Sequence, residues 1–158
     1  METVYKDYKT IELNEAEKMF EIFLNNMRHY AEKNPLYASI LKEEYKEKWI
    51  KNIMENANVK DFLYYENGEL IAFITIKVSE TEQYVNDFHI IPSYQGDGST
   101  FKNMILGALP HLDVSKEFTG DIWMLNNHSR DVFKHLGAKF ENDKYRINFE
   151  NLKKWIDK

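Results

Sequence analysis

The sequence predicts one α+β domain over residues 1–158, with helices flanking a mixed, mostly antiparallel central sheet in the order β-α-α-β-β-β-α-β-α-β. Three observations lead to this class. Apolar residues recur at helical spacing through most of residues 14–55. Two alternating runs then meet at Asn67 and Gly68, a strong hairpin signal. Residues 84–109 have the pattern of a strand, a glycine-rich turn and a helix.

The amino-terminal part predicts one strand and two helices. Residues 3–12 alternate well enough for the strand. Asn14 precedes Glu17 by three positions, which is the spacing of a capping box, and we expect a helix from there to about residue 32. Asn34 followed by Pro35 is typical of a new helix start, and the apolar stripe then continues to about residue 55. Both apolar stripes are more typical of a core than of a cofactor site.

The middle of the chain predicts an antiparallel meander. Strand-like runs at 61–66 and 69–78 flank the hairpin turn, and a looser polar turn leads into a third strand from residue 84. Proline closes this strand at position 92, because it has no backbone N–H to donate. A helix over 100–109 follows the glycine turn.

The carboxyl-terminal part adds two helices and the last strands. We expect a strand over 118–125, a short helix over 126–136 and a terminal helix over 149–157. Residues 139–148 are strand-like and fit either one strand or two strands broken at Asn142 and Asp143.

Composition excludes several classes of function. The chain has no cysteine, so disulfides, zinc–thiolate sites and a thiol nucleophile are excluded. His111, His128 and His135 show no metal-ligand spacing, and no metal is expected. A net charge of −5 argues against non-specific nucleic-acid binding and favours cationic or neutral small partners. The polar start of the chain and the lack of a long apolar run predict a cytoplasmic protein with no membrane association.

The turn QGDGST at residues 95–100 predicts an anion site. Gly96 and Gly98 permit positive φ and close backbone approach, while Ser99 or Thr100 are candidate caps for the following helix. Such a turn directs unpaired N–H groups and the positive end of the helix dipole at one spot, which suits a phosphate. The turn has no Gly-Lys-Ser/Thr and only two glycines, so it is neither a P-loop nor a dinucleotide fingerprint.

With its flanks, IIPSYQGDGST resembles motif A of the GNAT N-acetyltransferase superfamily, in which the amides of the turn hold the pyrophosphate of acetyl-coenzyme A. Thr100 stands where this family prefers Gly or Ala, and Asp97 where Lys or Arg is frequent. The order of elements also agrees with the GNAT fold. The resemblance implies that the cofactor-binding residues of the turn are Gln95, Gly96, Asp97, Gly98, Ser99 and Thr100.

A second stretch, Asn126-x-x-Ser129-x-x-Val-Phe133-x-x-Leu-Gly, resembles motif B of the same superfamily. The resemblance implies that Asn126 and Ser129 contact the pantetheine and phosphate arms of the cofactor. Phe133 stands where the family commonly has the Tyr that protonates the leaving thiolate, and Phe has no ionisable proton. Three interpretations stay open: water or another side chain supplies the proton, the acyl group or geometry differs, or catalysis has been lost.

The strand before the turn supplies the candidates for catalysis. Asp87 and His89 share one face of it, and Phe88 and Ile90 share the other. Histidine changes charge near neutral pH, which suits a base for the amine, although a structural core histidine fits the pattern equally well. Asp87 is a candidate for binding or deprotonating the amine, or alternatively a hydrogen-bonded structural carboxylate. We expect the backbone amides of residues 90 and 91 (Ile90, Ile91) to polarise the thioester carbonyl.

The resemblance thus implies a GNAT-type N-acetyltransferase that uses acetyl-CoA as co-substrate. It would transfer acetyl directly to the amine of a small molecule or peptide, and a homodimer is possible because many relatives pair. The alternative hypothesis is a catalytically impaired GNAT-like protein that binds CoA derivatives or a partner. A plain interaction domain would require that the turn at 94–100 bind no phosphate.

Overall fold

The computed structural model describes residues 2–96, 98–122 and 126–158. Within them, seven strands form one sheet in the order β1-β2-β3-β4-β5-β7-β6. Only β4 and β5 run parallel in this part of the chain, which confirms the predicted mixed, mostly antiparallel sheet. The strands are β1 (Glu2–Asp7), β2 (Val59–Glu66), β3 (Glu69–Val78), β4 (Glu82–Ile90), β5 (Glu117–Asp121), β6 (Lys139–Glu141) and β7 (Lys144–Ile147).

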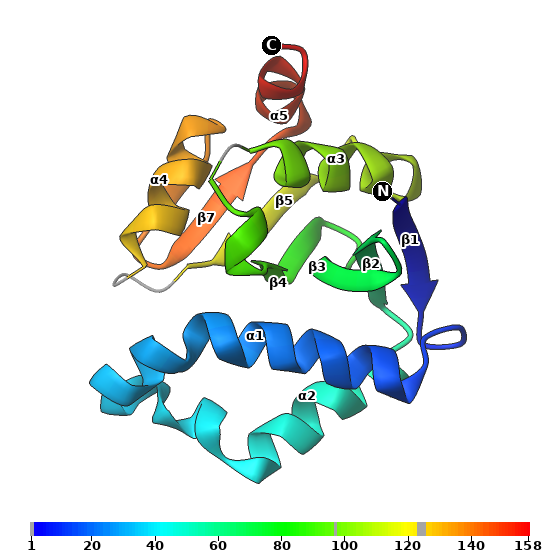
Figure 1. Ribbon diagram of the computed structural model, residues 1–158. Coiled ribbons are helices and arrows are strands. Elements are labelled where there is room, and N and C mark those ends of the chain that lie inside the picture. Colours follow the sequence, from blue (N-terminus) through cyan, green and yellow to red (C-terminus); the bar gives the residue numbers. More distant parts are fainter. Residues whose placement is uncertain (1, 97, 123–125) are drawn as a thin grey trace.

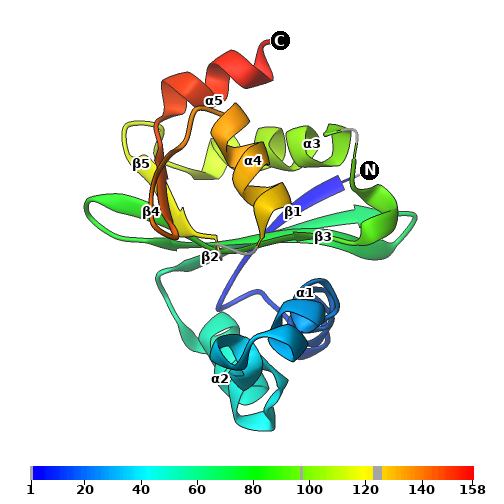
Figure 2. The same ribbon diagram turned by 90° about the vertical axis from the view of Figure 1, so that its left-hand side faces the viewer.

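Helices cover both faces of the sheet, as Figures 1 and 2 show. One face carries the first two helices, and the opposite face carries the other three. No helix among the described residues combines the length and the apolar character needed to cross a membrane. The helices are α1 (Leu13–Lys33), α2 (Glu43–Glu55), α3 (Ser99–Ala108), α4 (Asn127–His135) and α5 (Phe149–Ile156), with short 3₁₀ turns at Pro35–Leu41, Pro92–Tyr94 and Leu109–His111.

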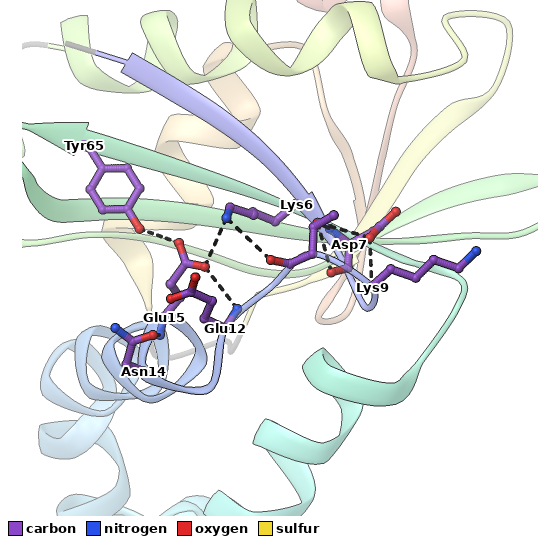
Figure 3. Close-up of polar contacts among 8 residues, drawn as sticks. Lys6, Asp7, Lys9, Glu12, Asn14, Glu15 and Tyr65 are labelled. Carbon is purple, nitrogen blue, oxygen red and sulfur yellow. Dashed lines mark hydrogen bonds and ion pairs between the residues drawn. The ribbon is translucent and has the colours of Figure 1, made fainter.

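The start of α1 differs from the sequence prediction. The capping residue is Glu12, not Asn14, and the side chain of Glu15 accepts the Glu12 backbone N–H at 3.1 Å. Figure 3 shows why: the Glu15 carboxylate also accepts the Tyr65 hydroxyl at 2.7 Å and pairs with Lys6 at 3.4 Å. These partners on β1 and β2 fix Glu15 at the capping-box position, and spacing along the sequence does not reveal them.

The second predicted helix is divided. Residues Pro35–Leu41 form a 3₁₀ turn, and extended Lys42 (φ −86°, ψ 145°) separates it from α2. Asn34 does cap this segment, because its side chain accepts the Leu36 N–H. The turn buries Ile40 at 3% exposure but leaves Leu36 at 81%. The apolar stripe continues through this region without interruption, so the sequence pattern does not show that the helix is divided. Tertiary packing determines the division.

The meander forms as predicted. Asn67 (φ 52°) and Gly68 (φ 78°) adopt the positive φ of a tight hairpin turn between β2 and β3. The open alternative at residues 139–148 resolves to two strands, β6 and β7, with Asn142 at φ 55° between them. The first strand ends at Asp7, five residues before the predicted end, where Thr10 and Asp7 close a hydrogen-bonded turn.

Two apolar layers hold the helices to the sheet. Phe23 and Ile53 pack with Leu63 and Phe73 beneath α1 and α2. On the other face, Met104 of α3 packs against the sheet, and the carboxyl-terminal helices enclose a further cluster. The buried members of that cluster are Phe101, Phe118, Ile122, Leu136, Tyr145, Ile147 and Leu152.

The backbone of Gly120 in β5 lies directly against the ring of Tyr145. It lies opposite Tyr145 of β7, and a Cβ at Gly120 would stand 2.6–2.7 Å from the phenol ring and hydroxyl. Because Tyr145 is 2% exposed, its ring can move aside only by disturbing the buried side chains packed around it. We expect Gly120→Ala to lower the free energy of unfolding by about 2 kcal/mol in urea titrations.

The double variant Gly120→Ala/Tyr145→Leu tests the cause of that loss. If the methyl group acts through the ring, the double variant is less destabilised than the sum of the two single changes. Additive losses would contradict the proposed clash.

Candidate functional site

The site is built where β4 and β5 stop pairing. Among the described residues, the parallel ladder joins Glu82–Val85 to Glu117–Gly120 and goes no further, while β4 continues to Ile90. A bulge at Asn86, between the pairs Thr75–Asp87 and Ile76–Val85, lies where the two strands diverge. The two strands thus form a fork that opens after Val85 and Gly120.

The two predicted amide donors point in opposite directions. The Ile91 N–H donates to Ile71 of β3 at 2.9 Å, so it is already engaged in the sheet. Bonded and non-bonded pairs alternate in an antiparallel ladder, so the backbone N–H and C=O of Ile90 face away from β3 and toward the fork. The Ile90 carbonyl accepts the side chains of Asn26 (3.0 Å) and Gln95 (2.7 Å). Of the two amides, the one at Ile90 faces the fork.

The glycine turn leads from the end of β4 into α3. Gly98, at φ 77°, is the N-cap of α3, so Ser99 and Thr100 are its first two residues and not caps. The φ of Gly96 is 117°. Leaving aside the residues adjacent in sequence, no atom of the described part of the chain lies within 4 Å of a Cβ built at Gly96 or Gly98, so the outer side of the turn is open. The N–H groups of a first helical turn lack partners within the helix, and the turn therefore suits an anion. The prediction for Asp97 lies outside the described residues.

The start of α4 is held by side chains to the strands beside it. The Asn126 side chain caps the helix by accepting the Ser129 N–H at 3.2 Å. Arg130 donates to the carbonyls of Ile122 (3.2 Å) and Asn142 (3.0 Å), and its guanidinium lies 4.3 Å from the Phe140 ring. Arg130 is thus a structural residue in this geometry. The helix start keeps the two predicted motif B residues, Asn126 and Ser129, adjacent.

Phe133 points into an apolar layer. Its ring centroid lies 4.6 Å from that of Tyr145 and 6.3 Å from that of Phe101. Burial raises the pKa of the Tyr145 phenol well above its usual value, so this neighbour holds its proton firmly. Hydrophobic packing therefore accounts for a Phe at this position.

Asp87 and His89 lie together on the face of the sheet that α1 and α2 cover. The His89 Nε2 is 3.6 Å from Asp87 Oδ1, and the Trp49 indole donates to Asp87 Oδ2 at 3.1 Å. The side chains of Asp87 and His89 are 17% and 12% exposed, respectively. Tyr45 lies close enough that Asp87 adds to the effect of burial, which raises the pKa of this phenol to about 12.

The contacts of Asn26 fix the tautomer of His89. A carbonyl only accepts, so the Asn26 atom facing the Ile90 oxygen is the amide nitrogen. The same nitrogen lies 3.4 Å from His89 Nδ1, which must then accept, leaving the proton on Nε2 toward Asp87. His89 thus contacts the Asn26 amide through Nδ1, while its Nε2 lies 3.6 Å from Asp87, beyond hydrogen-bond distance.

Sequence reasoning identified the strand but not its supporting residues. Trp49 belongs to the second apolar stripe, which was assigned to the core, yet its indole donates to Asp87. Asn26 lies on the first predicted helix outside its apolar stripe, and its side chain contacts His89. The indole N–H of Trp49 within an apolar stripe was the one local signal. Among the described residues, no group of three or more His, Asp or Glu side chains is arranged to hold a metal ion.

Comparison with known proteins identifies the fold. No family model and no curated protein matches the sequence. The chain is similar to the PaiA N-acetyltransferase of Thermoplasma acidophilum in complex with coenzyme A, with 16% identity, coverage of 92% of this chain and 97% of that chain, and a TM-score of 0.60. An acyl-CoA N-acyltransferase from Pseudomonas aeruginosa has 11% identity, coverage of 92% and 97%, and a TM-score of 0.66.

A third similar structure is an aminoglycoside acetyltransferase from an uncultured soil metagenomic sample in complex with sisomicin. It has 14% identity, coverage of 84% of each chain and a TM-score of 0.58. At such low identities the likeness establishes architecture. The protein has the fold of the GNAT acetyltransferases, as the two sequence motifs predicted.

Proposed function

We propose that the protein is an acyl-CoA-dependent N-acetyltransferase that acts on the amine of a small molecule or peptide. The observation that carries this proposal is the fork after Val85 and Gly120, with the Ile90 amide facing it. The open turn at Gly96 and Gly98 continues directly from the same strand, so phosphate and thioester subsites would follow one another along the chain. The fold of the similar structures is consistent with this assignment.

In direct transfer, the nitrogen lone pair of a neutral amine attacks the thioester carbonyl, the N–C bond forms, and the C–S bond breaks to release the thiolate of CoA. The Ile90 N–H would donate to the oxygen as it gains negative charge. Asp87 would hold the substrate ammonium and take its proton. No covalent intermediate on the protein is required.

The departing thiolate must gain a proton from another source than Phe133. Tyr145 adjoins Phe133, but it is 2% exposed and burial raises the pKa of its phenol. After the attack the nitrogen must shed one further proton to become the neutral amide, and water that enters through the fork would accept this proton and pass one to the thiolate. A thioester is already activated and positioning supplies much of the rate, so loss of one acid is compatible with turnover.

Acceptor chemistry follows from the surroundings of Asp87. A carboxylate with an indole N–H on one oxygen and aromatic rings nearby suits a cationic amine, which gains from charge pairing and from contact with the ring faces. The similar aminoglycoside acetyltransferase with bound sisomicin is consistent with a small-molecule amine.

One observation favours a second candidate function. Phe133 packs against Phe101 and Tyr145 and leaves the usual acid absent, as in a GNAT-like protein that binds CoA derivatives or a partner without turnover. Acetyl transfer to any amine that depends on Asp87 would exclude this candidate.

Titration calorimetry with coenzyme A and acetyl-CoA tests cofactor binding. We expect micromolar affinity, weakened at least about tenfold by Gly98→Trp, because the new side chain strains a φ of 77° and fills the open side of the turn. Gly68→Trp is the matched control, since Gly68 also has positive φ (78°) and open space but lies in the β2–β3 hairpin.

The outcomes separate clearly. Equal weakening by the two Trp variants would assign the loss to global strain and not to the turn. No heat and no thermal shift at millimolar cofactor would show that the proposed function is wrong.

A further inference from the structure

An apolar cavity of about 40 Å³ lies between the sheet and the helices α3 and α4. It belongs to the face opposite Asp87 and His89. Its lining consists of aliphatic and aromatic side chains, with no Asp, Glu, Lys, Arg, Asn or Gln among them. The six that matter here are Val85, Phe88, Phe101, Ile105, Phe133 and Tyr145. A cavity of this chemistry stays dry and accepts apolar groups.

The position of the cavity relates it to the fork. Val85 is the last β4 residue paired with β5, and Phe88 lies between it and Ile90. Phe88 and Ile90 lie on the same side of the strand, and both pack in the apolar layer under α3. Of the residues that line the cavity, Phe88 lies nearest along β4 to Ile90, two positions before it. Phe133 contributes another wall from α4.

We propose that the preferred acyl donor carries a chain of three or four carbons, propionyl- or butyryl-CoA, whose tail lies in this cavity; this inference rests on the proposed function. A space of 40 Å³ has room for about three water-sized atoms, whereas acetyl offers one methyl group. A succinyl tail would bury a carboxylate without a partner, which is strongly unfavourable. Phe133 adds an aromatic wall without a hydroxyl of its own, which suits the same apolar ligand.

Calorimetry on the whole protein with free CoA and with acetyl-, propionyl-, butyryl- and succinyl-CoA tests the inference without knowledge of the acceptor. We expect affinity to rise about fourfold for each methylene added from acetyl to butyryl. Succinyl-CoA is expected to bind no better than acetyl-CoA. Affinity that is equal along the series, or highest for acetyl-CoA, would overturn the inference.

Two variants test the cavity itself. Ala108 lines it from α3 and is 1% exposed. Ala108→Val fills the space and should reduce the butyryl-to-acetyl affinity ratio at least about fivefold. Ile105→Ala enlarges the cavity, so the acyl chain length that gives the highest affinity should increase. Ile40→Ala is its matched control, because Ile40 is buried at 3% exposure in the layer on the other face of the sheet.

Thermal melts identify a cavity variant that does not fold. If one of Ala108→Val and Ile105→Ala fails to fold, the other one tests the inference. Unchanged chain-length ratios in a folded cavity variant would overturn the inference, while the micromolar binding of CoA would leave the proposed function standing. If neither CoA nor any acyl-CoA binds the wild-type protein, the proposed function fails, and the inference fails with it.

Discussion

Asp61→Asn is expected to raise the free energy of unfolding by several kcal/mol, at most about 6, at pH 8.5 and to have little effect near pH 4. Asp61 lies in β2 with no exposed surface. Neither carboxylate oxygen has a hydrogen-bond partner in the described part of the chain, and the hydroxyl of its β3 neighbour Thr75 is also unpartnered there. Lys6 of β1 lies opposite Asp61, but its ammonium pairs with Glu15.

Burial raises the pKa of Asp61 from 3.8 to about 8, and the nearby charges of Asp7 and Glu15 add to the shift. Between these two values the folded state binds a proton that the unfolded state releases, so stability falls as the pH rises from about 4 to about 8. Above that range the buried carboxylate is fully charged, and the loss of folding stability reaches its full value. Asn has the shape of the neutral carboxyl and never ionises.

Urea unfolding of the wild type and the variant at pH 4.5, 6.5 and 8.5 measures this difference. Asp131→Asn is the control, because Asp131 is exposed on α4 and its replacement changes net charge equally. A destabilised Asp61→Asn protein at pH 8.5 would contradict the argument. It would indicate that Lys6 leaves Glu15 to pair with the ionised Asp61.

The second large effect is expected at Asp87. Asp87→Asn should lower kcat/KM for acetyl transfer by about 10²–10⁴-fold, since the amide neither takes the proton of the amine nor pairs with its charge. His89→Gln should lose less, because one nitrogen of His89 contacts the Asn26 amide and the other faces Asp87 at 3.6 Å. Steady-state rates against a panel of diamines and aminoglycosides, with acetyl- and butyryl-CoA as donors, give the comparison.

Binding of CoA is the control for the Asp87 variant. Asp87 lies on the α1 and α2 side of the sheet, away from the glycine turn, so calorimetry should give the wild-type affinity. A lost kcat with unchanged KM would indicate a base, and a raised KM would indicate an ammonium site. Activity that survives Asp87→Asn but not His89→Gln would reverse the two assignments.

Local sequence predicted those elements whose signals are local. Asn67 and Gly68 specified the hairpin through their tolerance of positive φ, and alternation along β4 placed Asp87 and His89 on one face. The glycine turn likewise lies before α3, although Gly98 and not Ser99 or Thr100 is the cap. The order of elements predicted the fold class together with the turn motif, because helical spacing, alternation and turn residues are all signals of the local sequence.

Tertiary structure decided what depends on distant partners. The start of α1 follows from the bonds of Glu15 to Lys6 and Tyr65, and the division of the second helix follows from the burial of Ile40. The tautomer of His89 depends on Asn26, 63 positions away in sequence. The fork forms where β4 and β5 stop pairing, and the apolar cavity forms where the helices of the carboxyl-terminal half pack on the sheet. Sequence by itself determined fold class and candidate chemistry, since these depend on residue type and short spacing; the three-dimensional packing decided which groups are engaged, buried or open to a substrate.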